Sequence, residues 1–228
     1  MWYICANKNG MSAQNLQRLL GLRSYNTAWL CLHKLRRAMV RPGRECLSGI
    51  VEADETYVGG SKEGKRGRGA FGKQIVFVAA EVRGRKIGRI RLCHIPNVSG
   101  ATLAHAVSDV IVVGTEVRTD GWQGYSSIKE AGYEHVVLST NSNELQNETA
   151  LPKCHLVISL LKRWILGTLQ GNVGKAHLQD YLNEFTFRFN RRSAKSRGLL
   201  FYRLAQLAVV TDPNPRSTIV KPQDVVSG

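Results

Sequence analysis

Three apolar segments that follow one another closely constrain the fold of this chain more than any other feature. They lie at residues 49–58, 74–82 and 86–95, and their branched side chains predict three consecutive β-strands. A helix, a strand, a short helix and another strand follow, at residues 101–112, 116–119, 125–131 and 135–139. This order predicts an α/β fold with a mixed five-stranded sheet and flanking helices. A crossover after the third strand would bring the fourth strand beside the first.

The first forty residues predict two short helices. Ser12 can cap a helix over residues 13–20, Gly21 ends it, and Ser24 can cap a second helix over residues 26–39. A short turn between two such helices is typical of a helix-turn-helix, although a plain helical hairpin that packs on the main domain would show the same pattern.

The remainder of the chain completes the expected domain organisation. Three more helices are predicted at residues 155–169, 175–191 and 199–210, and a proline-containing tail follows them. We therefore expect a small helix-turn-helix-like DNA-binding segment, a main α/β domain and a disordered tail. Their expected bounds are residues 1–46, 47–210 and 211–228.

The net charge of +15 is unevenly distributed along the chain. Residues 1–46 hold 8 bases and 1 acid (+7), residues 47–150 hold 12 of each (0), and residues 151–228 hold 12 bases and 4 acids (+8). Two basic ends around a neutral middle indicate surfaces that attract a polyanion, on either side of a site that tolerates carboxylates. The basic loop at residues 62–73 suits a DNA contact or a solvated hairpin tip. The candidate DNA-binding residues are Lys34, Arg36, Arg37, Lys62, Lys65, Arg66, Arg68, Lys73, Arg163, Arg188, Arg191 and Arg192.

Other classes of protein are disfavoured by composition. The longest purely apolar run, at residues 75–80, is too short to span a bilayer, and the N-terminus lacks the pattern of a secretory signal. The five cysteines include no C-x-x-C pair, which argues against a structural zinc site and favours a reducing cytoplasmic compartment. The spacing of the other histidines, namely His33, His94, His105, His135 and His177, indicates no metal site either.

Two acidic residues stand out by their positions in the predicted sheet. Asp54 lies inside the first strand, where an acid is costly unless it is paired or binds a metal ion. Asp120 ends the fourth strand and precedes a glycine, at a place where ligands gather in α/β sheets. If the two strands are neighbours, both carboxylates can share Mg²⁺ or Mn²⁺. The alternative is a solvent-facing strand acid and an unrelated turn aspartate.

A polar stripe marks the helix predicted at residues 155–169. His155, Ser159 and Lys162 share one face of this helix, at i, i+4 and i+7. The arrangement fits a metal ligand followed by a base that binds phosphate. A lone histidine near a helix start and a solvated lysine would give the same stripe.

The sequence resembles bacterial insertion-sequence transposases of the DDE type. Four blocks carry this resemblance: EADETYVGG at 52–60, TDGWQGY at 119–125, LLKRWILGT at 160–168 and HLQDYLNEFTFRFNRR at 177–192. It extends over about residues 5–210. The resemblance implies an RNase H-like catalytic domain related to that of retroviral integrases.

The resemblance also implies an activity and a set of site residues. The enzyme would cut DNA at the ends of a mobile element and join the freed 3′-hydroxyl to target DNA, with two Mg²⁺ or Mn²⁺ ions. Asp54, Asp120 and His155 match the three metal-ligand positions, and Lys162 matches a lysine that contacts DNA near the scissile phosphate. A homo-oligomer on DNA and a cytoplasmic, nucleoid-associated location are also implied.

Two departures from the family pattern leave an alternative open. The third ligand position usually holds an acid, and His155 would suit Mn²⁺ better than Mg²⁺. Members usually carry a four-cysteine zinc ribbon before the helix-turn-helix, and the expected consequence of its absence here is weaker recognition of the element ends. The alternative is a truncated, catalytically inactive remnant that only binds DNA. Glu148 is a further candidate for the third acid.

Overall fold

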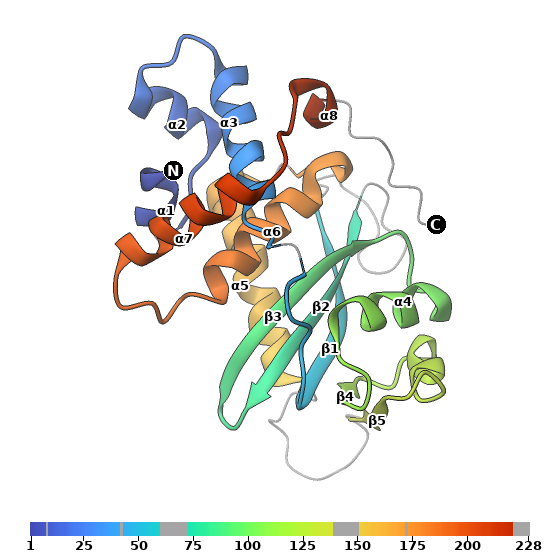
Figure 1. Ribbon diagram of the computed structural model, residues 1–228. Helices are drawn as coiled ribbons and strands as arrows, with labels where there is room; N and C mark the ends of the chain where they lie inside the picture. Colours follow the sequence, from blue (N-terminus) through green and yellow to red (C-terminus); the bar gives the residue numbers. More distant parts are fainter. Residues whose placement is uncertain (8, 42, 60–72, 139–150, 172, 221–228) are drawn as a thin grey trace. The chain divides into compact units, whose positions relative to one another are not determined.

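The computed structural model describes residues 1–7, 9–41, 43–59, 73–138, 151–171 and 173–220 (Figure 1). The chain forms two compact units, which we call the sheet unit (residues 45–163) and the helical unit (residues 1–44 with 164–228). These bounds differ from the ones expected at residues 46 and 210. The reason is that the helices after residue 164 pack with the N-terminal helices.

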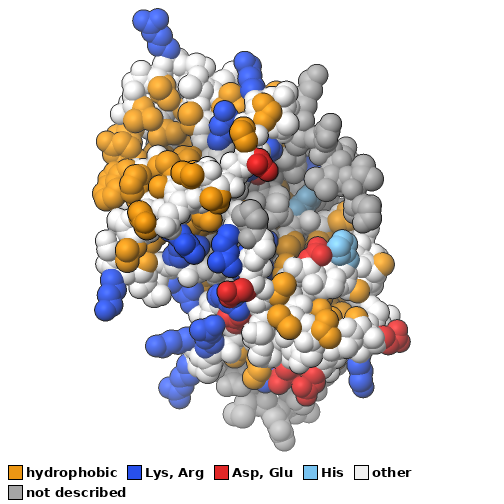
Figure 2. Space-filling model, in the orientation of Figure 1, with side chains coloured by type: hydrophobic (Ala, Val, Ile, Leu, Met, Phe, Trp, Pro, Cys, Tyr) orange, Lys and Arg blue, Asp and Glu red, His pale blue; other side chains and the backbone are white. Residues whose placement is uncertain are grey.

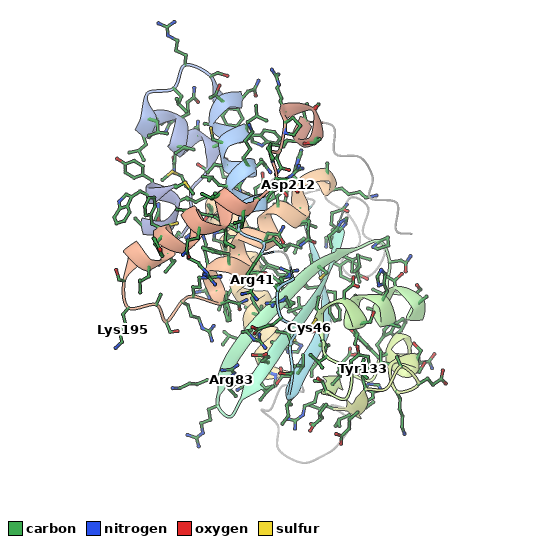
Figure 3. The ribbon with its side chains drawn as sticks, in the orientation of Figure 1. Arg41, Cys46, Arg83, Tyr133, Lys195 and Asp212 are labelled. Carbon is green, nitrogen blue, oxygen red and sulfur yellow. The ribbon has the colours of Figure 1, made fainter. Side chains whose placement is uncertain are left out.

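The sheet unit contains one mixed five-stranded sheet. Its strands are β1 (Ile50–Val58), β2 (Gln74–Arg83), β3 (Lys86–Ile95), β4 (Glu116–Thr119) and β5 (Glu134–Val137), in the order β3-β2-β1-β4-β5. β2 is antiparallel to both of its neighbours, β1 and β3, whereas β4 is parallel to β1 and β5 is parallel to β4. Arg83 marks the tight turn between β2 and β3 (Figure 3). The predicted α/β fold with a mixed five-stranded sheet, in which the fourth strand lies beside the first, is confirmed.

Helices cover both faces of this sheet. α4 (Gly100–Val110) begins at Ser99, whose Oγ accepts the N–H of Thr102 at 3.4 Å, and it packs on one face (Figure 1). Val51 and Ala53 of β1 join α4 and the 3₁₀ helix η1 (Gln123–Ile128) in one buried core. The alternate residues of β1 face the start of α5 (Pro152–Leu169), since successive strand side chains point to opposite faces.

The segment before β1 is tied to the end of α4. Leu47 donates its N–H to the carbonyl of Val110 and accepts the N–H of Val112, at 2.7 and 2.9 Å. Tyr133, labelled in Figure 3, donates its hydroxyl to the carbonyl of Ile111 at 3.1 Å. These bonds fix the position of the segment that leads into β1 relative to the end of α4.

The helical unit contains the predicted pair of N-terminal helices and the C-terminal helices. Its elements are α1 (Trp2–Ala6), α2 (Ala13–Leu20), α3 (Tyr25–Ala38), η2 (Lys175–His177), α6 (Leu178–Phe189), α7 (Arg197–Val210) and α8 (Arg216–Val220), together with the second half of α5. Ser12 caps α2 by accepting the N–H of Asn15 at 3.2 Å, and Gly21 ends the helix at φ 62°. Leu16, Leu32 and Leu204 meet in its core.

The part of the predicted tail that the structure describes, residues 211–220, is ordered. α8 lies within it, and its Ile219 is fully buried. Arg37 of α3 donates to Asn214 Oδ1 at 3.0 Å and to the carbonyl of Thr218 at 3.2 Å. The prolines suggested disorder, but one buried apolar side chain and these bonds hold the segment in place.

Exposed apolar side chains gather on one surface of the helical unit. Figure 2 shows them over α1, α2 and α7. The exposed apolar residues of these three helices include Trp2, Leu20, Tyr202 and Val209. None of the described helices is long and apolar enough to cross a membrane.

A buried ion pair joins α3 to α6. Arg36 Nε donates to Glu184 Oε2 at 2.8 Å, and the two side chains are 2% and 0% exposed. Glu184 Oε1 also accepts Arg188 Nε at 2.9 Å. Since the guanidinium groups of Arg36 and Arg188 share the Glu184 carboxylate, we expect a substitution of Glu184 to destabilise the protein.

We expect Glu184→Gln to lower the free energy of unfolding by about 3–5 kcal/mol, because it leaves the Arg36 charge buried without its counter-charge. Urea denaturation followed by far-UV circular dichroism measures this loss. The control is Glu116→Gln, which breaks the partly exposed pair with Arg118 and should change stability by less than about 1 kcal/mol. Equal effects of the two substitutions would contradict the prediction.

Candidate active site

The strand register places Asp54 and Asp120 side by side. β1 and β4 are parallel, and Glu52 pairs with Arg118. Two residues further along each strand, the same register brings Asp54 opposite Asp120, which directly follows β4. Neighbouring strands lie about 4.8 Å apart, and residues opposite each other in a parallel pair point to the same face. The two carboxyl groups therefore lie on the same face of the sheet, on neighbouring strands.

The start of α5 is anchored on β1 by a buried carboxylate. Glu52 Oε2 accepts the backbone N–H groups of Lys153 and Cys154, at 2.7 and 2.9 Å. The thiol of Cys154 is within 3.2 Å of the carbonyl of Glu52 and 3.5 Å of that of Val78. An acid at this position satisfies unpaired N–H groups of the first helical turn and complements the helix dipole.

This anchor brings His155 to Asp54. His155 Nε2 lies 3.3 Å from Asp54 Oδ2, and the other oxygen, Oδ1, accepts the N–H of Glu55 at 2.8 Å. The imidazole is 47% exposed and the Asp54 side chain 13% exposed. The site is therefore reachable from solvent, although the carboxylate itself is largely enclosed.

The surroundings of Asp54 disfavour its ionised form. Burial raises the pKa of Asp54 above its usual value, and the nearby charge of Asp120 adds to this effect. The Glu55 N–H and His155 act in the opposite direction and lower the pKa. A carboxyl group that is costly to ionise in the free protein gains most from a cation.

The turn after β4 orients Asp120. Its Oδ1 accepts the N–H of Trp122 at 3.0 Å, and the residue is exposed. Gly121 has a φ of +83°, and a Cβ there would lie 2.8 Å from Val137 Cγ1. Glycine is therefore required for Asp120 to leave the strand in this direction.

Lys162 lies two turns after His155 on the same face of α5. His155, Ser159 and Lys162 are all exposed, whereas Val157 and Leu161 on the other side of the helix are fully buried. The helix thus presents the predicted polar stripe to solvent. Arg163 is exposed next to it.

The donor set of this site suits a divalent cation. Two carboxylates and one imidazole match the oxygen and nitrogen ligands of Mn²⁺, and the oxygens alone match Mg²⁺. His155 Nε2 and Asp54 Oδ2 already converge at 3.3 Å, as two ligands of one ion must. The donor set therefore fits a metal ion at Asp54 and His155, and Asp120, which follows the neighbouring strand, is a candidate for a further ligand.

Two residues expected to bind DNA have internal partners instead. Arg36 is buried in its pair with Glu184, so contact with phosphate is not available to it. Arg188 donates to Glu184 and to the carbonyl groups of Ile4 and Asn7, and its side chain is 11% exposed. Both are corrections to the expectation, because residue type and net charge do not reveal a buried partner.

The other basic candidates differ in their exposure. Lys34 is exposed, Lys73 is half-buried, and Arg37 is half-buried beside Asp180, with 3.5 Å between Nε and Oδ1. Arg191 and Arg192 cover the rings of Phe187 and Phe189, with 4.1 Å from each guanidinium carbon to its ring centre. Four candidates lie outside the described residues, namely Lys62, Lys65, Arg66 and Arg68, as does Glu148.

Sequence reasoning missed Glu52 as a site residue. Glu52 and Asp54 alternate with apolar residues on β1, so one face of this buried strand carries two acids. That pattern signals that both acids have partners. It does not indicate that the partner of Glu52 is a helix start 101 residues further along the chain.

Comparison with known proteins places the chain among transposases. The family described as ISXO2-like transposase domain matches residues 46–190. The crystal structure of the catalytic core domain of BIV integrase matches with a TM-score of 0.38 and 16% identity, over 66% of this chain and 86% of that one. No curated protein matches the chain.

We expect Glu52→Ala to lower the free energy of unfolding by about 1–3 kcal/mol, because it leaves the N–H groups of Lys153 and Cys154 without an acceptor. Chemical denaturation measures the loss. Glu52→Gln keeps an oxygen acceptor and should lose less. An unchanged stability of Glu52→Ala would show that the anchor contributes nothing.

We expect Asp54 to make the metal-free protein less stable as pH rises. Its pKa is raised on folding, so its favourable contribution is complete below the ordinary value of 3.8 and is lost as pH rises through the folded value. Urea denaturation in EDTA across this pH range should show the loss as a difference: the unmodified protein should lose stability relative to Asp54→Asn as pH rises, since other groups such as Glu81 contribute to both proteins. Asp109→Asn, which changes an exposed aspartate of α4, should keep it.

Proposed function

This chain belongs to the ISXO2-like transposase family, and we propose that it cuts DNA at the ends of a mobile element and joins the freed 3′-hydroxyl to target DNA. The observation that carries this proposal is the approach of His155 to Asp54, next to the strand that leads into Asp120. Asp54 and Asp120 lie on neighbouring parallel strands, and His155 approaches Asp54 to 3.3 Å. In this arrangement a phosphodiester and the groups that act on it can meet at one place.

Each residue of the site would have a distinct part in the reaction. Asp54, Asp120 and His155 would hold divalent cations, which stabilise the attacking and leaving oxygens of phosphodiester displacement. Lys162 would bind a phosphate of the DNA beside the reacting one, since its exposed ammonium lies on the same helix face as His155. Glu52 acts through α5 and is a positioning residue.

Double-stranded DNA is the proposed partner of the exposed basic residues. Lys34, Lys162 and Arg163 are available to phosphates as the structure stands. Holding two element ends together requires more than one copy of the chain, so we propose a homo-oligomer on DNA in the cytoplasm, at the nucleoid.

A nicking assay tests the proposal directly. The substrate is a labelled duplex that carries the inverted repeat flanking the gene, incubated with Mg²⁺ or with Mn²⁺. We expect nicking at the repeat end, and we expect Asp54→Asn to reduce it by about 100-fold or more, the scale of losing one contact to a developing charge. Asp109→Asn is the matched control and should cleave normally. Binding of the duplex without cleavage in either metal would favour the alternative, an inactive remnant that only binds DNA.

The third ligand gives a separate prediction. We expect His155→Glu to increase cleavage in Mg²⁺ relative to Mn²⁺, because a carboxylate suits Mg²⁺ better than an imidazole does. The measured quantity is the ratio of the two nicking rates, compared with that of the unmodified protein. A ratio that does not change would exclude His155 from the metal site.

A further inference from the structure

A second group of metal-ligating side chains lies inside the helical unit, apart from the residues of the proposed active site. It consists of His33 on α3, His177 in η2 and Asp180 on α6. One ligand atom from each of the three lies within 4.8 Å of the others. Ligand atoms of a tetrahedral zinc ion are about 3.4 Å apart, so the three ligand atoms need to move only slightly closer together to bind one ion.

The cluster contains buried ring nitrogens that the protein does not satisfy. His33 is fully buried, and its Nδ1 lies 2.8 Å from Asp180 Oδ2. Among the described residues, neither His33 Nε2 nor the buried His177 Nδ1 has a hydrogen-bond partner. Buried polar atoms nearly always have a hydrogen-bond partner, so the lack of one at these two nitrogens indicates that a ligand can bind there.

The surroundings of both imidazoles disfavour their protonated form. Burial lowers the pKa of His33, and the charge of Arg36 lowers it further, against the opposing effect of Asp180. Burial also lowers the pKa of His177. A neutral imidazole keeps a free lone pair at neutral pH, which is the form that coordinates a metal.

The neighbouring charges and rings are compatible with a bound cation. Glu184 pairs with Arg36 and balances it, while Arg37 Nε lies 3.5 Å from Asp180 Oδ1. Trp29 packs against both imidazoles, with ring centres 4.2 Å from His33 and 4.9 Å from His177. These ring contacts restrict the orientation of the two imidazoles.

We propose that His33, His177 and Asp180 form a binding site for a late transition-metal ion such as Zn²⁺, which joins α3 to the start of α6. Imidazole nitrogens with one carboxylate favour Zn²⁺ or Co²⁺ over Mg²⁺. The sequence indicated no metal site at these histidines, because His33 and His177 are far apart in the chain and only the fold brings them together. The ion would stabilise α3, the second helix of the helix-turn-helix-like pair.

Metal titration of the full, untagged chain tests this site. The background is the double variant Asp54→Asn and Asp120→Asn, which removes the carboxylates of the proposed active site and so keeps its ions out of the count. After treatment with EDTA, Zn²⁺ is added in competition with a chromophoric chelator, and Co²⁺ serves as a spectroscopic probe. We expect one equivalent of Zn²⁺, a visible Co²⁺ absorption band and a higher melting temperature with Zn²⁺.

Matched variants distinguish the site from non-specific binding. His177→Gln and Asp180→Asn should each weaken Zn²⁺ binding by about 10-fold or more. His105→Gln, which changes an exposed histidine of the sheet unit, should leave it unchanged. Circular dichroism without metal shows whether each variant folds, and His177, which is only half-buried, is the more tolerant position.

Two results would overturn the proposal. One is the absence of Zn²⁺ binding in the double variant, which would mean that water satisfies the two nitrogens. The other is stoichiometric binding that survives both His177→Gln and Asp180→Asn. Neither result bears on DNA cleavage, which depends on Asp54 and Asp120, so failure of this proposal and failure of the proposed function are distinguishable.

Discussion

The carboxylate of Glu52 holds the first turn of α5 against β1, and the candidate active site depends on this contact. Two backbone N–H groups converge on one of its oxygens, at 2.7 and 2.9 Å. Because the donors are the peptide groups of Lys153 and Cys154, the bonds hold the helix backbone and do not depend on the rotamers of these two residues. His155 follows directly and is therefore held at 3.3 Å from Asp54.

Two acids on the same strand thus have different environments. Glu52 is buried and its charge is satisfied by a helix start. Asp54, two residues later, is partly exposed, and its carboxyl has a raised pKa because burial and Asp120 oppose ionisation. Glu52 therefore positions the helix that carries His155, whereas the surroundings of Asp54 disfavour its negative charge. A cation between Asp54, Asp120 and His155 would stabilise that charge.

Charge counting alone overestimated the DNA-binding surface. Arg36 and Arg188 belong to the basic ends of the chain, yet both are held by Glu184 inside the helical unit. Lys34 and Lys162, in contrast, are exposed as expected. A sequence shows that a residue is basic, but burial depends on whether a distant acid meets it, here 148 residues away for Arg36. The tail was misjudged for a similar reason, since Ile219 finds a buried position.

The sequence by itself determined the order and type of most elements and the positions of Asp54 and Asp120 on them. Alternation of apolar residues, serine caps and glycine stops are local signals, so they can be detected within a few residues. The tertiary structure decided the register between β1 and β4, the docking of α5 by Glu52, and the meeting of His33 with Asp180, 147 residues apart. The register, the docking and the contact each depend on which surfaces pack together after folding. A local sequence pattern carries no information about the distance between residues that are far apart in the chain.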